Sequence, residues 1–181
     1  MVDEVGLNSL SLAALADRLG VKQPSLYKHM ESLAGLQRSV CMRSKRDLGQ
    51  AFARVAVGRS GADAVHAMAR AYREWAVRHP GLYQAAMTMP APGDVEDEAT
   101  QINAIQIIAD VLTAYELRGD DAVDAIRAFR SILHGFVSLE TSGGFTMTAD
   151  IDVSFDRLIH GFTVALTHWN EPAAAAEEAR P

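Results

Sequence analysis

Apolar residues recur every three or four positions along most of the chain, which predicts amphipathic helices. The pattern is clearest over residues 61–79, 99–117, 122–140 and 153–169. Each segment places its apolar side chains on one stripe of a helix that faces a core. No segment alternates apolar and polar residues between turn signals, so no sheet is expected. The sequence therefore predicts an all-α fold, with a tail after Asn170 that frays.

Two short helices joined by a glycine turn are predicted near the N-terminus. Ser11 can cap a helix over 12–19, which ends at Gly20, a residue suited to the left-handed conformation. A second helix is expected from about Gln23 to His29, with a proline in its first turn. Two such helices make a helix-turn-helix, although a compact corner of a helical bundle has the same spacing. The residues expected to form the small core are Leu15, Leu19, Val21 and Leu26.

The second short helix carries side chains able to contact DNA. Lys22 and Gln23 stand at its N-terminal end, which in such motifs enters the major groove and meets base edges. The hydroxyl, ammonium and imidazole groups that follow can donate to phosphates, which fixes register without distinguishing sequences. The candidate DNA-binding residues are Ser11, Lys22, Gln23, Pro24, Ser25, Tyr27, Lys28 and His29.

The stretch Leu12–His29 closely resembles the DNA-binding signature of TetR-family transcriptional regulators, with Leu-Gly-Val followed in register by Leu-Tyr-x-His. A second segment, Leu133–Glu140 followed by Gly-Gly-Phe, is similar to a C-terminal subtype of that family with a His-Gly motif. The resemblance implies an all-helical homodimer that binds double-stranded operator DNA and represses transcription until a small ligand binds. It also implies a DNA-binding domain over 1–48 and a ligand-binding and dimerisation domain over 49–181.

Three features depart from the family pattern. A full helix normally precedes the helix-turn-helix, whereas only Met1–Val5 stands there in this sequence. Leu33 occupies the place of a lysine that contacts phosphate. Gly35 replaces a glutamate, so Ser32 caps the next helix without a reciprocal partner. The alternative is therefore a helical small-molecule-binding dimer that has lost DNA binding.

The helices expected over 122–140 and 153–169 each carry a glycine within the apolar stripe, Gly135 and Gly161. A glycine inside a helix costs about 1 kcal/mol relative to alanine, so a close helix crossing is the expected reason. The resemblance places the dimer interface here as a four-helix bundle, while close packing inside one protomer is the alternative. The expected interface residues are Phe129, Leu133, Gly135, Phe136, Phe155, Leu158, Gly161, Phe162 and Trp169.

The middle helices are expected to enclose a pocket for a small, mostly apolar molecule. Aromatic and methionine side chains suit such a wall, although the same stripes are typical of an ordinary core. The candidate lining residues are Tyr72, Trp75, Met87, Met89, Ile108, Leu112 and Phe129.

Net charge, its distribution and the cysteine content further restrict the class of protein. The net charge is −6, yet residues 1–48 hold seven Lys/Arg against five Asp/Glu, whereas residues 49–181 hold ten against eighteen. A mildly basic start on an acidic body is compatible with a DNA-binding end. The single cysteine, Cys41, excludes an intramolecular disulfide. No membrane span or signal peptide is recognisable, so a cytoplasmic protein is expected.

No catalytic residue, metal site or cofactor is expected. The sequence has no Ser/His/Asp order, glycine-rich phosphate loop or metal-ligand spacing, which disfavours an enzyme. His134 and His160 precede the two glycines and could bind a metal as neutral imidazoles. No Glu-x-x-His pair or nearby cysteine supports such a site, so hydrogen-bonded structural roles are favoured for both.

Overall fold

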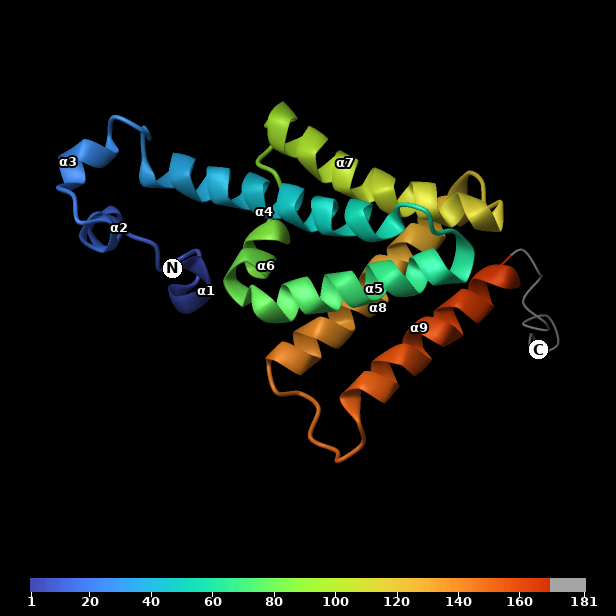
Figure 1. Ribbon diagram of the computed structural model, residues 1–181. Helices are drawn as coiled ribbons and strands as arrows, with labels where there is room; N and C mark the ends of the chain where they lie inside the picture. Colours follow the sequence, from blue (N-terminus) through green and yellow to red (C-terminus); the bar gives the residue numbers. More distant parts are fainter. Residues whose placement is uncertain (170–181) are drawn as a thin grey trace, which may run out of the picture.

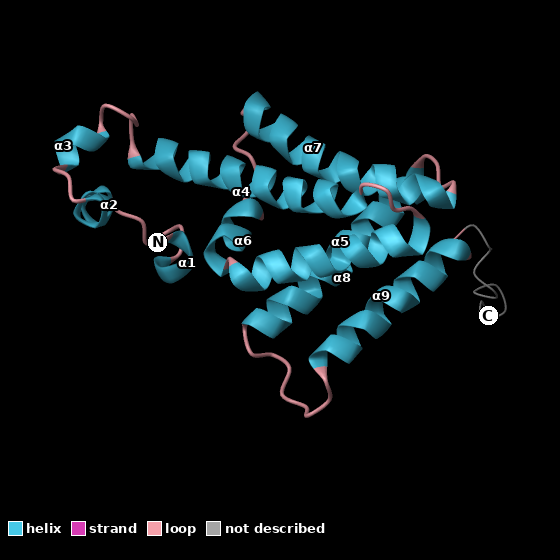
Figure 2. Ribbon diagram, in the orientation of Figure 1, coloured by secondary structure: helices cyan, strands magenta, loops and turns pink. Residues whose placement is uncertain are grey.

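The computed structural model describes residues 1–169, and all regular structure in this range is helical (Figure 1 and Figure 2). The all-α prediction is confirmed, while the expected fraying after Asn170 lies outside the described residues. None of the described helices is apolar over a length that could span a membrane. The elements are α1 (Val2–Val5), α2 (Leu12–Leu19), α3 (Gln23–Leu26), α4 (Leu33–Ala56), α5 (Gly61–Arg78), α6 (Pro80–Ala86), α7 (Val95–Leu112), the 3₁₀ turn η1 (Thr113–Tyr115), α8 (Asp120–Thr141) and α9 (Ile151–Thr167).

The long helix α4 is the central element of the arrangement. It packs along α5, α6 and α7, and α8 and α9 cover the other side of α5 (Figure 1). Its N-terminal end projects beyond this bundle and meets α2 and α3, which lie apart from the other helices. One helix therefore joins the small N-terminal module to the bundle.

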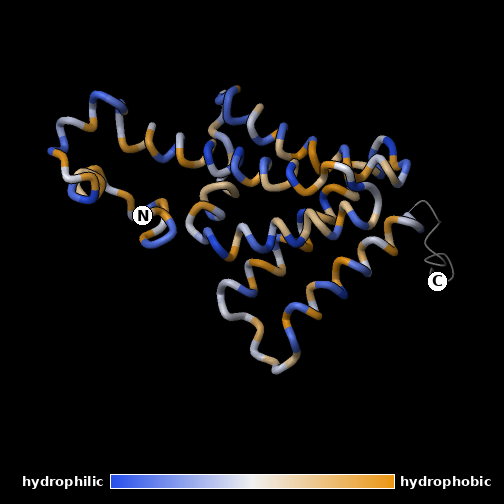
Figure 3. Tube along the Cα trace, viewed as in Figure 1, coloured by the Kyte–Doolittle hydropathy of each residue, from blue (hydrophilic) through white to orange (hydrophobic). Residues whose placement is uncertain are grey.

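The bundle encloses one large apolar core. Its buried side chains come from α4 to α9. Figure 3 shows hydrophobic positions recurring along these helices. Val65, Met68, Phe129 and Phe155 are at most 1% exposed. Burying each large side chain contributes about 1.5–3 kcal/mol, so this core dominates the stability of the fold.

Arg73 ties α5 to the two C-terminal helices. Its guanidinium donates to both carboxylate oxygens of Glu140, at 2.6 and 2.8 Å, and lies 2.7 Å from a carboxylate oxygen of Asp152. It also lies over the rings of Phe136 and Phe155, at 5.5 and 5.0 Å from their centroids. The hydrogen bond to Glu140 raises the pKa of Arg73, so the charge is fixed at this junction.

The N-terminal module has a much smaller core. Leu12, Ala16 and Leu26 are its buried members, with Leu15, Met30, Leu33 and Leu36 packed against them. The prediction was wrong for Leu19 and Val21, which are 59% and 42% exposed. Both residues come after Ala16, the last buried residue of α2. They lie at the turn between the two short helices, where no described helix covers them.

The one-turn helix α1 docks on the start of α6. The Asp3 carboxylate accepts hydrogen bonds from the backbone N–H groups of Gly81 and Leu82, both at 2.9 Å. A Cβ at position 81 would overlap the backbone of Val2, so only glycine permits this approach. Glu4 forms a two-pronged ion pair with Arg18 of α2, and the hydrogen bond from Arg18 lowers the pKa of Glu4 to about 2.

Candidate DNA-binding surface and ligand cavity

The exposed side of α2 and α3 presents all eight candidate DNA-binding residues to solvent. Leu26 is the buried residue of α3, while the aromatic ring of Tyr27 is 54% exposed. Ser11 also has a local role, because its Oγ accepts a hydrogen bond from the Ala14 N–H and caps α2. The other seven residues, all exposed, follow one another along the turn and the second helix: Lys22, Gln23, Pro24, Ser25, Tyr27, Lys28 and His29.

The turn geometry follows from local sequence. Gly20 adopts the left-handed conformation, with φ of 67°, and its N–H bonds to the carbonyls of Ala16 and Asp17. The second helix is shorter than predicted and ends at Leu26. Beyond it the chain continues as a tight turn, in which the His29 N–H bonds to the Leu26 carbonyl at 2.9 Å.

The start of α4 is fixed by packing as well as by its cap. Ser32 Oγ accepts a hydrogen bond from the Gly35 N–H at 3.0 Å, so the cap forms without a glutamate partner. Leu33 packs against the small core of the module, which gives the unusual leucine a structural role. Gln37 Nε2 donates to the Leu7 carbonyl at 3.1 Å and holds the preceding loop against α4.

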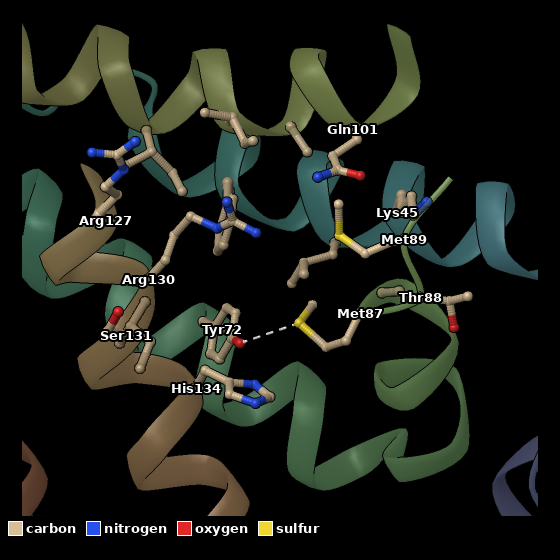
Figure 4. A pocket seen from close by; sticks show the side chains of 17 residues that line it. Lys45, Tyr72, Met87, Thr88, Met89, Gln101, Arg127, Arg130, Ser131 and His134 are labelled. Carbon is tan, nitrogen blue, oxygen red and sulfur yellow. Dashed lines mark hydrogen bonds between the residues drawn. The ribbon is translucent and has the colours of Figure 1, made fainter. Parts of the chain in front are cut away.

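A cavity of about 370 Å³ lies between α4, the α6–α7 connection, α7 and α8 (Figure 4). Its volume falls in the range of small-molecule sites. Most of its surface is apolar, supplied by leucine, isoleucine, methionine and aromatic side chains. The lining residues are Lys45, Leu48, Phe52, Tyr72, Ala86, Met87, Thr88, Met89, Gln101, Ala104, Ile105, Ile108, Arg127, Arg130, Ser131, Leu133 and His134.

Four of the seven expected lining residues, Tyr72, Met87, Met89 and Ile108, line this cavity. The expected set needs correction at three positions. Phe129 is turned into the core, where its ring stacks on Phe162 with centroids 5.3 Å apart, and Leu112 is likewise a buried core residue. Trp75 packs at the edge of the core near the end of α5, with its ring 5.7 Å from that of His79.

Apolar periodicity in the sequence does not identify the polar residues of the cavity wall. Lys45 Nζ lies 2.7 Å from an Asp97 carboxylate oxygen, and both side chains are almost fully buried. The buried Oε1 of Gln101 has no hydrogen-bond partner among the described residues. An unsatisfied buried acceptor costs about 1–3 kcal/mol, so a bound donor would stabilise it.

Two tyrosines and a histidine form a hydrogen-bonded chain behind the cavity. The hydroxyl groups of Tyr72 and Tyr83 are 2.9 Å apart, and the Tyr83 hydroxyl is 2.5 Å from His134 Nδ1. Burial raises the pKa of both phenols, so both stay protonated. Tyr83 can then donate to Nδ1 of a neutral His134, which leaves the Nε2–H of the imidazole as a donor.

A row of ion pairs joins the N-terminal half of α4 to the start of α7. The Arg38 guanidinium contacts both carboxylate oxygens of Asp94, at 2.5 and 2.6 Å, and lies 3.1 Å from Glu96. Arg46 lies 3.5 Å from the same glutamate. The hydrogen bond from Arg38 lowers the pKa of Asp94 to about 2. With Lys45–Asp97, these contacts fix α4 against α7.

The two C-terminal helices leave both glycines uncovered. A methyl group added at Gly135 or Gly161 would meet no atom of another element within 4 Å in the described residues. Close packing inside one protomer therefore does not explain them. Of the other expected interface residues, Leu158 and Trp169 are partly exposed, whereas the five with little free surface are Phe129, Leu133, Phe136, Phe155 and Phe162.

Residues 1–169 contain no group of three or more His, Cys, Asp or Glu side chains arranged to hold a metal ion. His134 is engaged by Tyr83 as described, and His160 is exposed on α9. Cys41 is buried, and its burial raises the pKa of the thiol, which disfavours the reactive thiolate.

Comparisons with known proteins agree with this architecture. The family model described as the tetracyclin repressor-like C-terminal domain matches residues 65–162. The HTH-type transcriptional regulator Rv0681 of Mycobacterium tuberculosis is 46% identical over 144 residues, which cover 78% of this chain and 66% of that protein. YobS of Bacillus subtilis, another HTH-type transcriptional regulator, is 32% identical over 170 residues, covering 92% and 86%.

A solved structure of a TetR variant from Acinetobacter baumannii AYE, in complex with minocycline, has the same fold. Its TM-score is 0.65 at 22% identity, over 94% of this chain and 92% of the other. Because both sequence relatives are HTH-type regulators, the alternative of a helical dimer that has lost DNA binding is not favoured.

Proposed function

Because the chain belongs to the TetR family of DNA-binding transcriptional regulators, we propose that it is a cytoplasmic, ligand-responsive repressor. In this proposal a homodimer binds operator DNA through the surface on α2 and α3. A small, mostly apolar molecule enters the cavity between α4, α7 and α8 and releases the DNA. No catalytic step is assigned to any residue.

The observation that carries this proposal is the position of α4. Leu33 and Leu36, near its start, pack against the core of the N-terminal module. Further along the same helix, Lys45, Leu48 and Phe52 line the cavity. A ligand that fits one position of α4 better than another therefore changes the pose of the module. It can shift the equilibrium only by its difference in affinity for the two states.

The proposed domains meet inside this helix. The division into residues 1–48 and 49–181 falls within α4, so the boundary is a shared helix rather than a linker. The ion pairs from Arg38 and Lys45 to α7 hold α4 in the present pose. Because Lys45 also lines the cavity, a ligand can alter these contacts directly.

The proposed division of labour on DNA separates base contacts from phosphate contacts. Gln23, at the exposed start of α3, reads a base edge, with Lys22 beside it. Tyr27 and Lys28 contact phosphates, together with the exposed Ser25 and His29. Two modules of a dimer would have to stand about 34–36 Å apart, one turn of B-DNA, to contact two half-sites of a palindrome.

Two substitutions test this division. Gln23→Ala should relax sequence preference at one base position, by about 1–3 kcal/mol for a two-pronged contact. Lys28→Ala should weaken binding to all sequences alike and reduce the salt slope by about one. Both are measured by titrating selected operator duplexes at several salt concentrations, with the distant, exposed Arg118→Ala as control. Equal, sequence-independent losses for both variants would contradict the assigned roles.

The outer face of α8 and α9 supports the proposed dimer. On α8, Ala128, Ile132, Gly135 and Leu139 follow one another at steps of four and three, and Leu139 is half exposed. On α9, Gly161 lies next to the exposed Val164 on the following turn. Two such stripes from each protomer can form a four-helix bundle, in which the glycines permit close approach.

Gly161→Leu should separate the protomers, because its side chain would enter the close crossing. Light scattering should then report a monomer, while Ala62→Leu, which adds bulk to exposed α5, should remain a dimer. An unchanged dimer for Gly161→Leu, or a monomeric parent protein, would overturn this interface.

A further inference from the structure

The wall of the cavity is positively charged, although the bundle as a whole is acidic. Residues 49–181 hold ten Lys/Arg against eighteen Asp/Glu. The lining nevertheless includes the three cations Lys45, Arg127 and Arg130, and no Asp or Glu among the described residues. An excess of cations inside an acidic domain needs an explanation other than overall composition.

Arg130 is the cation whose charge is not already compensated. Lys45 is paired with Asp97 at 2.7 Å, and Arg127 with Asp124 at 3.1 Å. Arg130 has no ion-pair partner within residues 1–169, and its guanidinium extends toward the middle of the cavity (Figure 4). The Arg130 side chain is exposed, so solvent reaches the cavity where this charge lies.

Two other polar residues of α8 line the same cavity. Ser131 is the next residue, and His134 lies one helical turn further, on the same side of α8 as Arg130. His134 Nδ1 lies 2.5 Å from the Tyr83 hydroxyl, and the residue also lines the cavity. Among these α8 residues, the Arg130 guanidinium is the group that favours an anionic oxygen group.

The rest of the cavity suits an apolar chain or ring. Leu48 and Phe52 come from α4, Ile105 and Ile108 from α7, and Met87 from the end of α6. The cavity thus combines apolar walls with one uncompensated cation on α8. A ligand that matches both parts has an apolar body and one anionic head group.

We propose that the cavity binds an organic carboxylate with an apolar body, its head group against Arg130 and its body against the α4 and α7 walls. This inference rests on the proposed function, since it names the class of ligand for the same site. A primary amine of the same shape would place its charge beside Arg130 and is disfavoured by like-charge repulsion. A neutral amide would fill the apolar part without gaining the ionic contact.

Calorimetric titration of the full chain with decanoate, decanamide and decylamine tests the proposal, since these probes differ mainly in the head group. Decanoate should bind about 10- to 100-fold more tightly than decanamide, the range expected for one charge-assisted hydrogen-bonded pair. Decylamine should bind most weakly. Arg130→Gln should abolish the preference for decanoate while leaving decanamide binding unchanged. Arg157→Gln, an exposed arginine of α9 outside the lining, should keep the parent preference.

The possible failures are distinguishable. Equal binding of decanoate and decanamide would overturn the anionic head group but leave an apolar ligand site. A preference for decanoate that survives in Arg130→Gln would overturn the role of Arg130. If none of the three probes binds to the protein or changes its binding to the operator, the cavity is not the ligand site. That result would also contradict the proposed response to a ligand. Thermal unfolding of Arg130→Gln should match the parent, because the side chain is exposed.

Discussion

The N-terminal module and the bundle bury their side chains on very different scales. In the module, the buried cluster consists of Leu12, Ala16 and Leu26. In the bundle, one continuous core draws on α4 to α9 and includes fully buried residues such as Phe129 and Phe155. Folding free energy grows with the apolar area that is buried, so the module on its own contributes little stability.

The difference shows how the molecule divides its tasks. Residues that contact DNA must be exposed, and Gln23, Tyr27 and Lys28 are exposed on a module too small to bury much else. The module is ordered through attachments to the bundle, at the start of α4 and through α1 on α6. Regions with few buried contacts open locally at lower free energy than the core. The position of the module therefore depends on the bundle.

The largest expected effect comes from the core of the bundle. Phe129→Ala removes a fully buried ring that stacks on Phe162 and should cost about 3–5 kcal/mol of unfolding free energy. Thermal unfolding followed by circular dichroism should show a large loss, together with loss of DNA and ligand binding. Val57→Ala, at a highly exposed position, should stay within about 0.5 kcal/mol of the parent. A small effect of Phe129→Ala would contradict the single large core.

A smaller and local effect is expected in the module. Leu26→Ala should cost about 2 kcal/mol or more of local stability, because it empties the centre of the small cluster. Hydrogen exchange should increase over residues 12–26 and operator binding should be lost, while the main unfolding transition stays in place. Leu19→Ala, at an exposed position, should leave exchange unchanged. A fall in the main transition equal to that of Phe129→Ala would mean that module and bundle unfold as one unit.

The smallest effect concerns the ion pairs between α4 and α7. Arg38 holds the pKa of Asp94 at about 2, below its ordinary value near 4. A lowered carboxyl pKa stabilises the fold above the ordinary value, and this contribution disappears as the pH falls toward 2. Denaturant unfolding should thus show the stabilities of the parent and Arg38→Gln converging between about pH 4 and 2. A difference that stays constant over this range would show that Arg38 acts through packing instead.

Local signals in the sequence predicted the local structure well. Ser11, Gly20 and Ser32 were recognisable as helix caps or stops, and each caps or ends a helix as the residue type suggests. Apolar periodicity placed the ends of α5, α8 and α9 within two residues, because a helix buries one stripe wherever its partner lies. For α7 the predicted range 99–117 was shifted toward the C-terminus, since the helix spans Val95–Leu112. The prediction made the second short helix too long, because apolar periodicity does not distinguish an α-helix from a tight turn that follows it.

Long-range arrangements were less accessible. An apolar stripe does not reveal whether its side chains face a core or a cavity, which is why Phe129 and Leu112 were assigned to the pocket. The sequence does contain one indication that Arg130 is unpaired. The residues three and four positions before and after it include no Asp or Glu, whereas Arg127 has Asp124 within one helical turn. A helical arginine without such a partner is available for a contact elsewhere.

The docking of α1 on α6 constrains how the module can move. A rigid body held at one point tilts in any direction, whereas one held at two points keeps a single rotational degree of freedom, about the line between them. Leu33 and Leu36 provide one anchor on α4, and Asp3 provides the other on α6. Helix α6 ends next to Met87, which lines the cavity. Both anchors thus lie on helices that border the cavity, so the proposed ligand would contact the helices at both ends of this axis.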